Sequence, residues 1–222
     1  MCGIVGYVGG QDATQVVVEG LRRLEYRGYD SAGVAVVTPV GVQSRKRAGK
    51  LANLEKALAE APLPDTTVGI GHTRWATHGA PNDVNAHPHL SEDGSLAVIH
   101  NGIIENFAEL RSLLQADGVT FLSETDTEVA AHLLAKMVGE TGSLTEAMQA
   151  TCRQLRGAFT LVAASAEDPD TLVGARRNSP LVVGLGDGET FLASDVSAFI
   201  AHTRRAMELG QDQVITITRE GV

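Results

Sequence analysis

Short apolar runs gather at the two ends of this chain, and segments with a helical spacing of apolar residues lie between them. The run CGIVGYV near the N-terminus predicts a strand, and further strands are predicted over residues 33–38, 67–73 and 95–102. After Gly157, Asp, Gly and Pro residues separate five more short apolar runs, which predict a meander of strands. These runs are FTLVAAS, TLVGAR, PLVVGLG, TFLAS and VITIT.

Apolar residues three or four positions apart predict three helices in the first half of the chain. Asp12 can cap the first helix, which we expect to end at Gly28, and the second helix covers residues 51–60. A third begins near Glu105 and stops at Gly118. Its predicted apolar stripe consists of Phe107, Leu110, Leu113 and Leu114.

Two capping boxes predict two more helices, one opened by Thr125–Glu128 and the other by Ser143–Glu146. Helices are thus grouped between two clusters of strands, which favours an α+β protein with antiparallel sheets over a βαβ array. We expect the two sheets to stack face to face with the helices outside.

The composition is that of an ordinary globular protein, with 222 residues of which 43% are hydrophobic. A net charge of −9 argues against nucleic acid or an anionic membrane as a partner, and no apolar run reaches the ~20 residues that span a bilayer. The two cysteines, Cys2 and Cys152, form no CxxC pair, which predicts a reducing cytoplasmic setting. Cys152 is predicted to be a core residue.

The interval RWATHGAPNDVNAHPHLSEDG, between two predicted strands, has neither a helical nor a strand period. Loops of this length in compact domains are often lids or binding loops. Four histidines, His78, His87, His89 and His100, fall in or near it, but their spacing lacks a helical i, i+4 pair and no cysteine is close. No metal site is predicted.

Cys2 stands directly behind the initiator methionine. A small residue there is compatible with removal of Met1, which would give Cys2 a free α-amino group with a pKa near 7.7–8.0. That residue could then supply both a nucleophile and its acid/base group. The alternative is a buried thiol in a strand. Position alone leaves both interpretations open.

Four motifs change the balance: LRRLEYRGYDSAG (21–33), GHTRWATHG (71–79), HNGIIEN (100–106) and SETDTE (123–128). In this order they resemble the glutaminase domains of class II glutamine amidotransferases, which are N-terminal-nucleophile hydrolases, and specifically the glucosamine-6-phosphate synthase branch. The resemblance implies a four-layer α/β/β/α sandwich over residues 2–222, a cytoplasmic enzyme of hexosamine biosynthesis, and no cofactor.

The resemblance also implies roles for individual residues. Cys2 is the thiol that attacks the side-chain amide of glutamine, and Asn101 and Gly102 supply the oxyanion hole. Arg74 pairs with the substrate α-carboxylate, and Asp126 receives its α-ammonium. Four further residues are expected to line or support the substrate pocket: Thr77, His78, Trp75 and Arg27. The strand over residues 95–102 is also predicted to run into a tight glycine turn at Asn101-Gly102, which is a common use of this pair and is compatible with the oxyanion role.

L-Glutamine is the small-molecule partner that the resemblance implies. In full-length members, the ammonia passes to a C-terminal sugar-phosphate isomerase domain, which we expect to be missing from these 222 residues, and the full-length protein is expected to be a homodimer. One alternative is the glutaminase half of another class II enzyme, such as amidophosphoribosyltransferase. Another is a silent module that binds glutamine without hydrolysing it.

Overall fold

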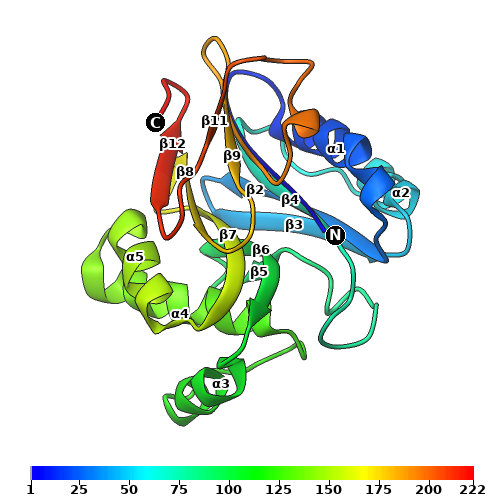
Figure 1. The fold of residues 1–222 in the computed structure, drawn as a ribbon. Coiled ribbons are helices and arrows are strands. Elements are labelled where there is room, and N and C mark those ends of the chain that lie inside the picture. The colour runs from blue at the N-terminus through cyan, green and yellow to red at the C-terminus, as the bar shows by residue number, and fades with distance from the viewer. Residues whose placement is uncertain (1) are drawn as a thin grey trace.

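The structure is a computed structural model that describes residues 2–222, so the predicted removal of Met1 lies outside the described residues. Its larger sheet has seven antiparallel strands (Figure 1). In spatial order these are β11 (Ala206–Glu208), β9 (Val182–Leu185), β10 (Thr190–Ala193), β1 (Gly3–Val8), β4 (Val68–Arg74), β2 (Ser31–Thr38) and β3 (Gly41–Ala48).

The second sheet has five antiparallel strands. In spatial order these are β12 (Val214–Thr218), β8 (Asp168–Arg177), β7 (Gly157–Ser165), β6 (Leu96–Ile104) and β5 (His89–Leu90). The helices are α1 (Ala13–Arg23), α2 (Leu51–Glu60), α3 (Phe107–Ala116), α4 (Asp126–Thr141) and α5 (Leu144–Gln154), with short 3₁₀ turns η1 (Glu25–Arg27) and η2 (Val196–Ala198).

Three apolar cores separate four layers. The middle core lies between the two sheets and includes Ile4 and Ile99. A second core, which includes Leu54, lies between the larger sheet and helices α1 and α2. A third, which includes Met148, lies between the smaller sheet and helices α4 and α5. Figure 1 shows the two helical groups on opposite outer faces, so the predicted α/β/β/α arrangement is confirmed.

The first strand shows how the sequence produces this layering. Ile4 and Val8 of β1 face the middle core, whereas Val5 and Tyr7 face the helices. This is the two-residue period of a strand covered on both faces. Because β1 pairs antiparallel with β4 and Gly3 lies opposite Thr73, the start of β1 and the end of β4 meet at the same edge.

Local capping signals predicted helix starts well. Asp12, Thr125 and Ser143 each accept a backbone hydrogen bond as N-caps of α1, α4 and α5. The Thr125–Glu128 capping box is only half formed, however, because the Thr125 N–H donates to Ser123 Oγ and not to the Glu128 side chain. The Glu128 carboxylate accepts hydrogen bonds from the backbone N–H groups of Leu122 and Ser123, at 2.7 Å each, because the chain before the helix folds back over it.

Some boundaries and orientations differ from the prediction. Helix α1 ends at Arg23 and is followed by η1, so only the 3₁₀ turn reaches Gly28. Leu113 is 59% exposed, because only the Leu110 and Leu114 side of α3 packs onto the core. Cys152 packs against the third core and is half-buried.

Two strand features were also mispredicted. The strand β3 was missed because its residues, GVQSRKRA, are mostly polar. The turn expected at Asn101-Gly102 is absent, since β6 continues through both residues to Ile104 and pairs with β7 along its whole length.

Candidate active site

A pocket of about 330 Å³ lies where the ends of β1 and β4 meet β6 and the start of α4. Residues distant in sequence come together here because antiparallel pairing brings strand ends to one edge. The predicted site residues that line it are Cys2, Arg27, Arg74, Trp75, Thr77, Asn101, Gly102 and Asp126. His78 is the one predicted site residue that does not line it.

The Cys2 thiol faces this pocket and is half-buried. Its Sγ accepts a hydrogen bond from the Trp75 backbone N–H at 3.1 Å. Burial raises the pKa of the thiol, and the Trp75 hydrogen bond opposes that rise in part. The Cys2 thiol is therefore not sealed in the core, which was the alternative interpretation of its position.

The Asn101 side chain is held by groups on both sides. Its Nδ2 donates to the Cys2 carbonyl oxygen at 3.1 Å, and its Oδ1 lies 2.9 Å from His72 Nε2. His72 is fully buried, and burial lowers its pKa to about 3, so the ring is neutral. A neutral ring that donates from Nε2 turns the Asn101 amide so that its N–H groups face Cys2. His72 belongs to the GHTRWATHG motif, but its role becomes visible only in the fold, where it meets Asn101.

Gly102 occupies a position that no other residue fits. Its φ is +117°, and a Cβ there would stand 2.0 Å from the Ala158 carbonyl oxygen. A side chain is therefore excluded by both backbone conformation and space. The glycine exposes its backbone to the pocket beside Asn101.

Arg74 is buried, with 4% of its surface exposed. Its Nη2 donates to the carbonyl oxygens of His78 and Gly79, whereas its buried Nη1 has no hydrogen-bond partner among residues 2–222. Burial lowers the pKa of the guanidinium, although it stays charged at neutral pH. A buried, charged donor with a free N–H is suited to a carboxylate.

Asp126 opens helix α4 and is also buried. Its Oδ2 accepts from the Ile104 N–H at 2.9 Å and lies 3.9 Å from His100 Nδ1. The carboxylate stands at the N-terminus of the helix, where the backbone N–H groups point outward. Arg74 and Asp126 thus present one cation and one anion to the same pocket.

The remaining predicted residues differ in how they contribute. Arg27 forms an ion pair with Asp195 at 2.8 Å and donates to the Cys2 carbonyl at 3.4 Å, which supports the strand end. Trp75 and Thr77 are exposed at the mouth of the pocket. His78 contributes its backbone carbonyl to Arg74, while its ring packs on Phe107.

Three histidines near the site, His87, His89 and His100, are buried. Burial lowers the pKa of His87, His89 and His100. Within residues 2–222, no group of three or more His, Cys, Asp or Glu side chains is arranged to hold a metal ion. None of the helices in this range is long and apolar enough to cross a membrane.

The layer order and the position of the thiol define the fold as that of the N-terminal-nucleophile amidotransferases. Several solved structures share it, among them the two that follow. The glutamine phosphoribosylpyrophosphate amidotransferase from B. subtilis matches 99% of this chain and 48% of its own, at a TM-score of 0.82 and 26% identity. A glutamine aminotransferase class-II domain protein from Silicibacter pomeroyi matches at a TM-score of 0.62 and 17% identity over 99% and 96% of the two chains, which bears on the fold alone.

The chain belongs to the glutamine amidotransferase domain family, which matches residues 59–221. Among curated relatives, glutamine–fructose-6-phosphate aminotransferase (isomerizing) of Streptomyces coelicolor is 66% identical over 100% of this chain and 36% of its own length. The Mycobacterium tuberculosis protein of the same name is 59% identical over the same shares. The chain therefore spans about 36% of the length of these relatives.

Proposed function

We propose that this chain hydrolyses the side-chain amide of L-glutamine to glutamate and ammonia. The observation that carries the proposal is the buried Arg74 Nη1, which lines a pocket shared with the Cys2 thiol and finds no hydrogen-bond partner in the part of the chain that the structure describes. An unpaired buried donor is costly unless a ligand completes it. A free amino acid offers a carboxylate to Arg74 and an ammonium to Asp126, which leaves its side chain to reach Cys2.

The chemistry requires a free Cys2 α-amino group, and hence removal of Met1. The amine takes the thiol proton as Sγ adds to the amide carbon. The resulting oxyanion accepts hydrogen bonds from Asn101 Nδ2, whose second N–H is not needed for the Cys2 carbonyl, and from the Gly102 N–H. The C–N bond of the substrate amide breaks as the α-ammonium group of Cys2 protonates the leaving nitrogen, which departs as ammonia. Water then attacks the thioester, glutamate leaves, and the thiol is restored.

We further propose that residues 2–222 are one glutaminase domain of a longer protein. The names and lengths of the curated relatives support this, since each is an aminotransferase of which the chain matches 36%. In such a protein, the ammonia would be used to make glucosamine 6-phosphate from fructose 6-phosphate in a C-terminal isomerase domain. The homodimer and the cytoplasmic location stay predictions.

Glutamate release tests the proposal on protein whose first residue has been identified by mass analysis. We expect turnover from the chain that begins at Cys2, none from Cys2→Ala, and unchanged turnover from Cys152→Ala, because Cys152 lies against the third core. Normal turnover by Cys2→Ala would refute the proposal. Glutamine binding without turnover in the verified wild type would support the silent module.

A further inference from the structure

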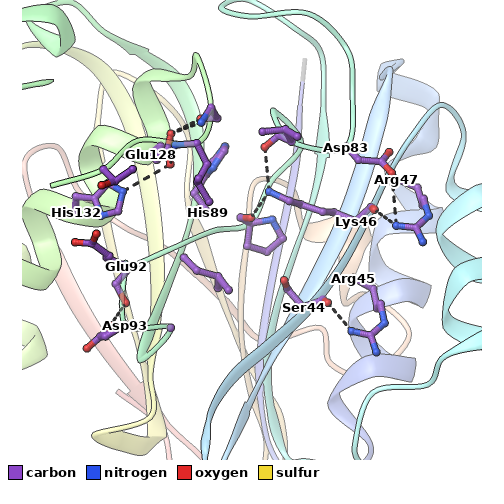
Figure 2. A pocket seen from close by; sticks show the side chains of 18 residues that line it. Ser44, Arg45, Lys46, Arg47, Asp83, His89, Glu92, Asp93, Glu128 and His132 are labelled. Carbon is purple, nitrogen blue, oxygen red and sulfur yellow. Dashed lines mark hydrogen bonds and ion pairs between the residues drawn. The ribbon is translucent and has the colours of Figure 1, made fainter.

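Lys46 of β3 uses its side chain to hold a segment that has no strand partner of its own. Its Nζ donates to the carbonyl oxygens of Val84, Ala86 and Pro88, at 3.1, 2.8 and 3.3 Å. These three hydrogen bonds use all the donors of an ammonium group. Figure 2 shows Lys46 reaching to this segment, whereas Arg45 points to the opposite side of the strand.

The held segment, residues 82–88, lies along β3. The Ala48 N–H donates to Asp83 Oδ1 at 2.7 Å, and Arg47 lies 3.5 Å from the other carboxylate oxygen. On β2, Gly33 pairs with Lys46, and a Cβ at Gly33 would stand 2.1 Å from the His87 carbonyl oxygen. The backbone of the segment therefore rests directly on the strands.

The same segment carries His87 into the active site. The His87 ring stacks on the His72 ring, with centroids 4.3 Å apart and an interplanar angle of 30°. His72 in turn bonds Asn101 Oδ1. Both rings are buried, so a shift of the segment moves the surface against which His72 is packed.

We propose that Lys46 is a positioning residue for the oxyanion-binding amide of Asn101. It acts through the 82–88 segment and the stacked His87 and His72 rings. This inference rests on the proposed function, and it assigns Lys46 no contact with the substrate.

The charges around Lys46 are compatible with this role. Burial lowers the pKa of Lys46 to about 8, while Glu128 and Asp83 favour the ammonium and Arg74 opposes it. His89, which is held neutral by burial, also faces the lysine. The group is therefore charged at neutral pH and can donate all three hydrogen bonds.

Replacing Lys46 tests the inference, with an exposed lysine as the matched control. Lys46→Met keeps the aliphatic stem and removes the donors, and Lys50→Met makes the same change four residues away at an exposed position. We expect Lys46→Met to lower kcat for glutamine hydrolysis by about tenfold or more, with KM changed by less than about twofold, because Arg74 and Asp126 are untouched. Lys50→Met should keep both values.

A measurement without turnover separates failure of this inference from failure of the proposed function. The imidazole NMR signals of His72 and His87 should shift in Lys46→Met and stay in place in Lys50→Met. Unchanged signals, a kcat equal to that of Lys50→Met, or a rise in KM alone would overturn the inference. If the histidine signals shift as expected in Lys46→Met but the wild type releases no glutamate, the proposed function is refuted instead. A Lys46→Met protein that shows no cooperative unfolding transition is not folded. In that case Lys46→Gln, which keeps two N–H donors, is compared with Lys50→Met by the same kinetic and NMR measurements.

Discussion

The backbone N–H of Trp75 donates to Cys2 Sγ at 3.1 Å, which ties the start of β1 to the loop that follows β4. Arg74, directly before Trp75, lines the same pocket, and its Nη1 is without a hydrogen-bond partner among the described residues. Thr77, two residues further along, lies at the mouth. The end of β4 and the short loop after it therefore shape both the environment of the thiol and the setting of the Arg74 guanidinium, to which the proposed function assigns the substrate carboxylate. Movement of this loop would alter the two together.

The raised pKa of Cys2 predicts slow alkylation at neutral pH in the chain that retains Met1. Because burial disfavours the thiolate, the alkylation rate should rise with pH through a midpoint above the ordinary value of 9.0. The rate of iodoacetamide labelling, followed by mass spectrometry against pH, measures this. Cys152 is an internal comparison. Burial raises its pKa to about 11, so its labelling should also require alkaline pH. A Cys2 midpoint near neutrality in this form would contradict the prediction.

Replacing Arg74 should weaken glutamine binding. Arg74→Met in a Cys2→Ala background removes the carboxylate partner without consuming the ligand. We expect affinity to fall by about thirtyfold or more, which corresponds to at least the ~2 kcal/mol cost of truncating one partner of a buried charge pair. Isothermal titration measures it. Arg74→Lys keeps the charge but not the planar pair of donors. Its affinity for glutamine should therefore lie between the affinities of the proteins with Arg74 and with Arg74→Met. Equal affinity in all three proteins would exclude the carboxylate role.

Glu128 should stabilise the fold in a pH-dependent way. Burial alone would raise the pKa of this carboxyl group, but hydrogen bonds from Ser123 and Leu122, together with His132 Nε2 at 3.6 Å, outweigh it and lower the pKa to about 2, from 4.5. A depressed folded-state pKa contributes stability that is present above about pH 4.5 and is lost as the pH falls toward 2. Glu128→Gln should therefore lower the free energy of unfolding at pH 7 by up to about 3 kcal/mol.

Urea unfolding of wild type and Glu128→Gln at pH 7 and at about pH 2.5 checks this prediction. The difference between them should shrink at the lower pH. The exposed Glu140, on the same helix, supplies the control, since Glu140→Gln should change stability by less than about 0.5 kcal/mol at either pH. A difference for Glu128→Gln that is equal at both values would show that the ionised carboxylate is not its source.

The sequence predicted those parts of the fold that depend on neighbouring residues. Helix starts followed from local caps such as Asp12 and Ser143, whose side chains accept N–H groups within their own first turn. The layer order followed from the grouping of strands and helices. The nine site residues came from motif resemblance, and eight of them converge on one pocket because the start of β1 meets the end of β4.

What the sequence missed depends on contacts between distant segments. The strand β3 is polar because it lies at the edge of the larger sheet, and its pairing with β2 rather than its own pattern defines it. His72 and Lys46 gave no separate signal, since their roles arise from partners at Asn101 and in the 82–88 segment. A histidine or lysine acquires such a role only once the chain has folded.

Gly102→Ala should impair both stability and turnover, because its φ of +117° is strained for alanine and the new Cβ would stand 2.0 Å from the Ala158 carbonyl. Relief of that overlap must move β6 or β7, and with it the Gly102 N–H. We expect glutamate release to fall by about a hundredfold or more, as for loss of an oxyanion donor. Unfolding measurements should show a loss of about 1–3 kcal/mol.

Gly139 in α4 provides the control for Gly102→Ala. A Cβ at Gly139 would meet nothing within 4 Å, and the residue lies inside a helix. Gly139→Ala should therefore raise stability by about 0.5–1 kcal/mol and leave turnover unchanged. If Gly102→Ala kept full activity, the Gly102 N–H would not be an oxyanion donor. If Gly102→Ala lost activity with unchanged stability, the role of the Gly102 N–H as an oxyanion donor would stand. The predicted loss of stability from the overlap with the Ala158 carbonyl would then be wrong.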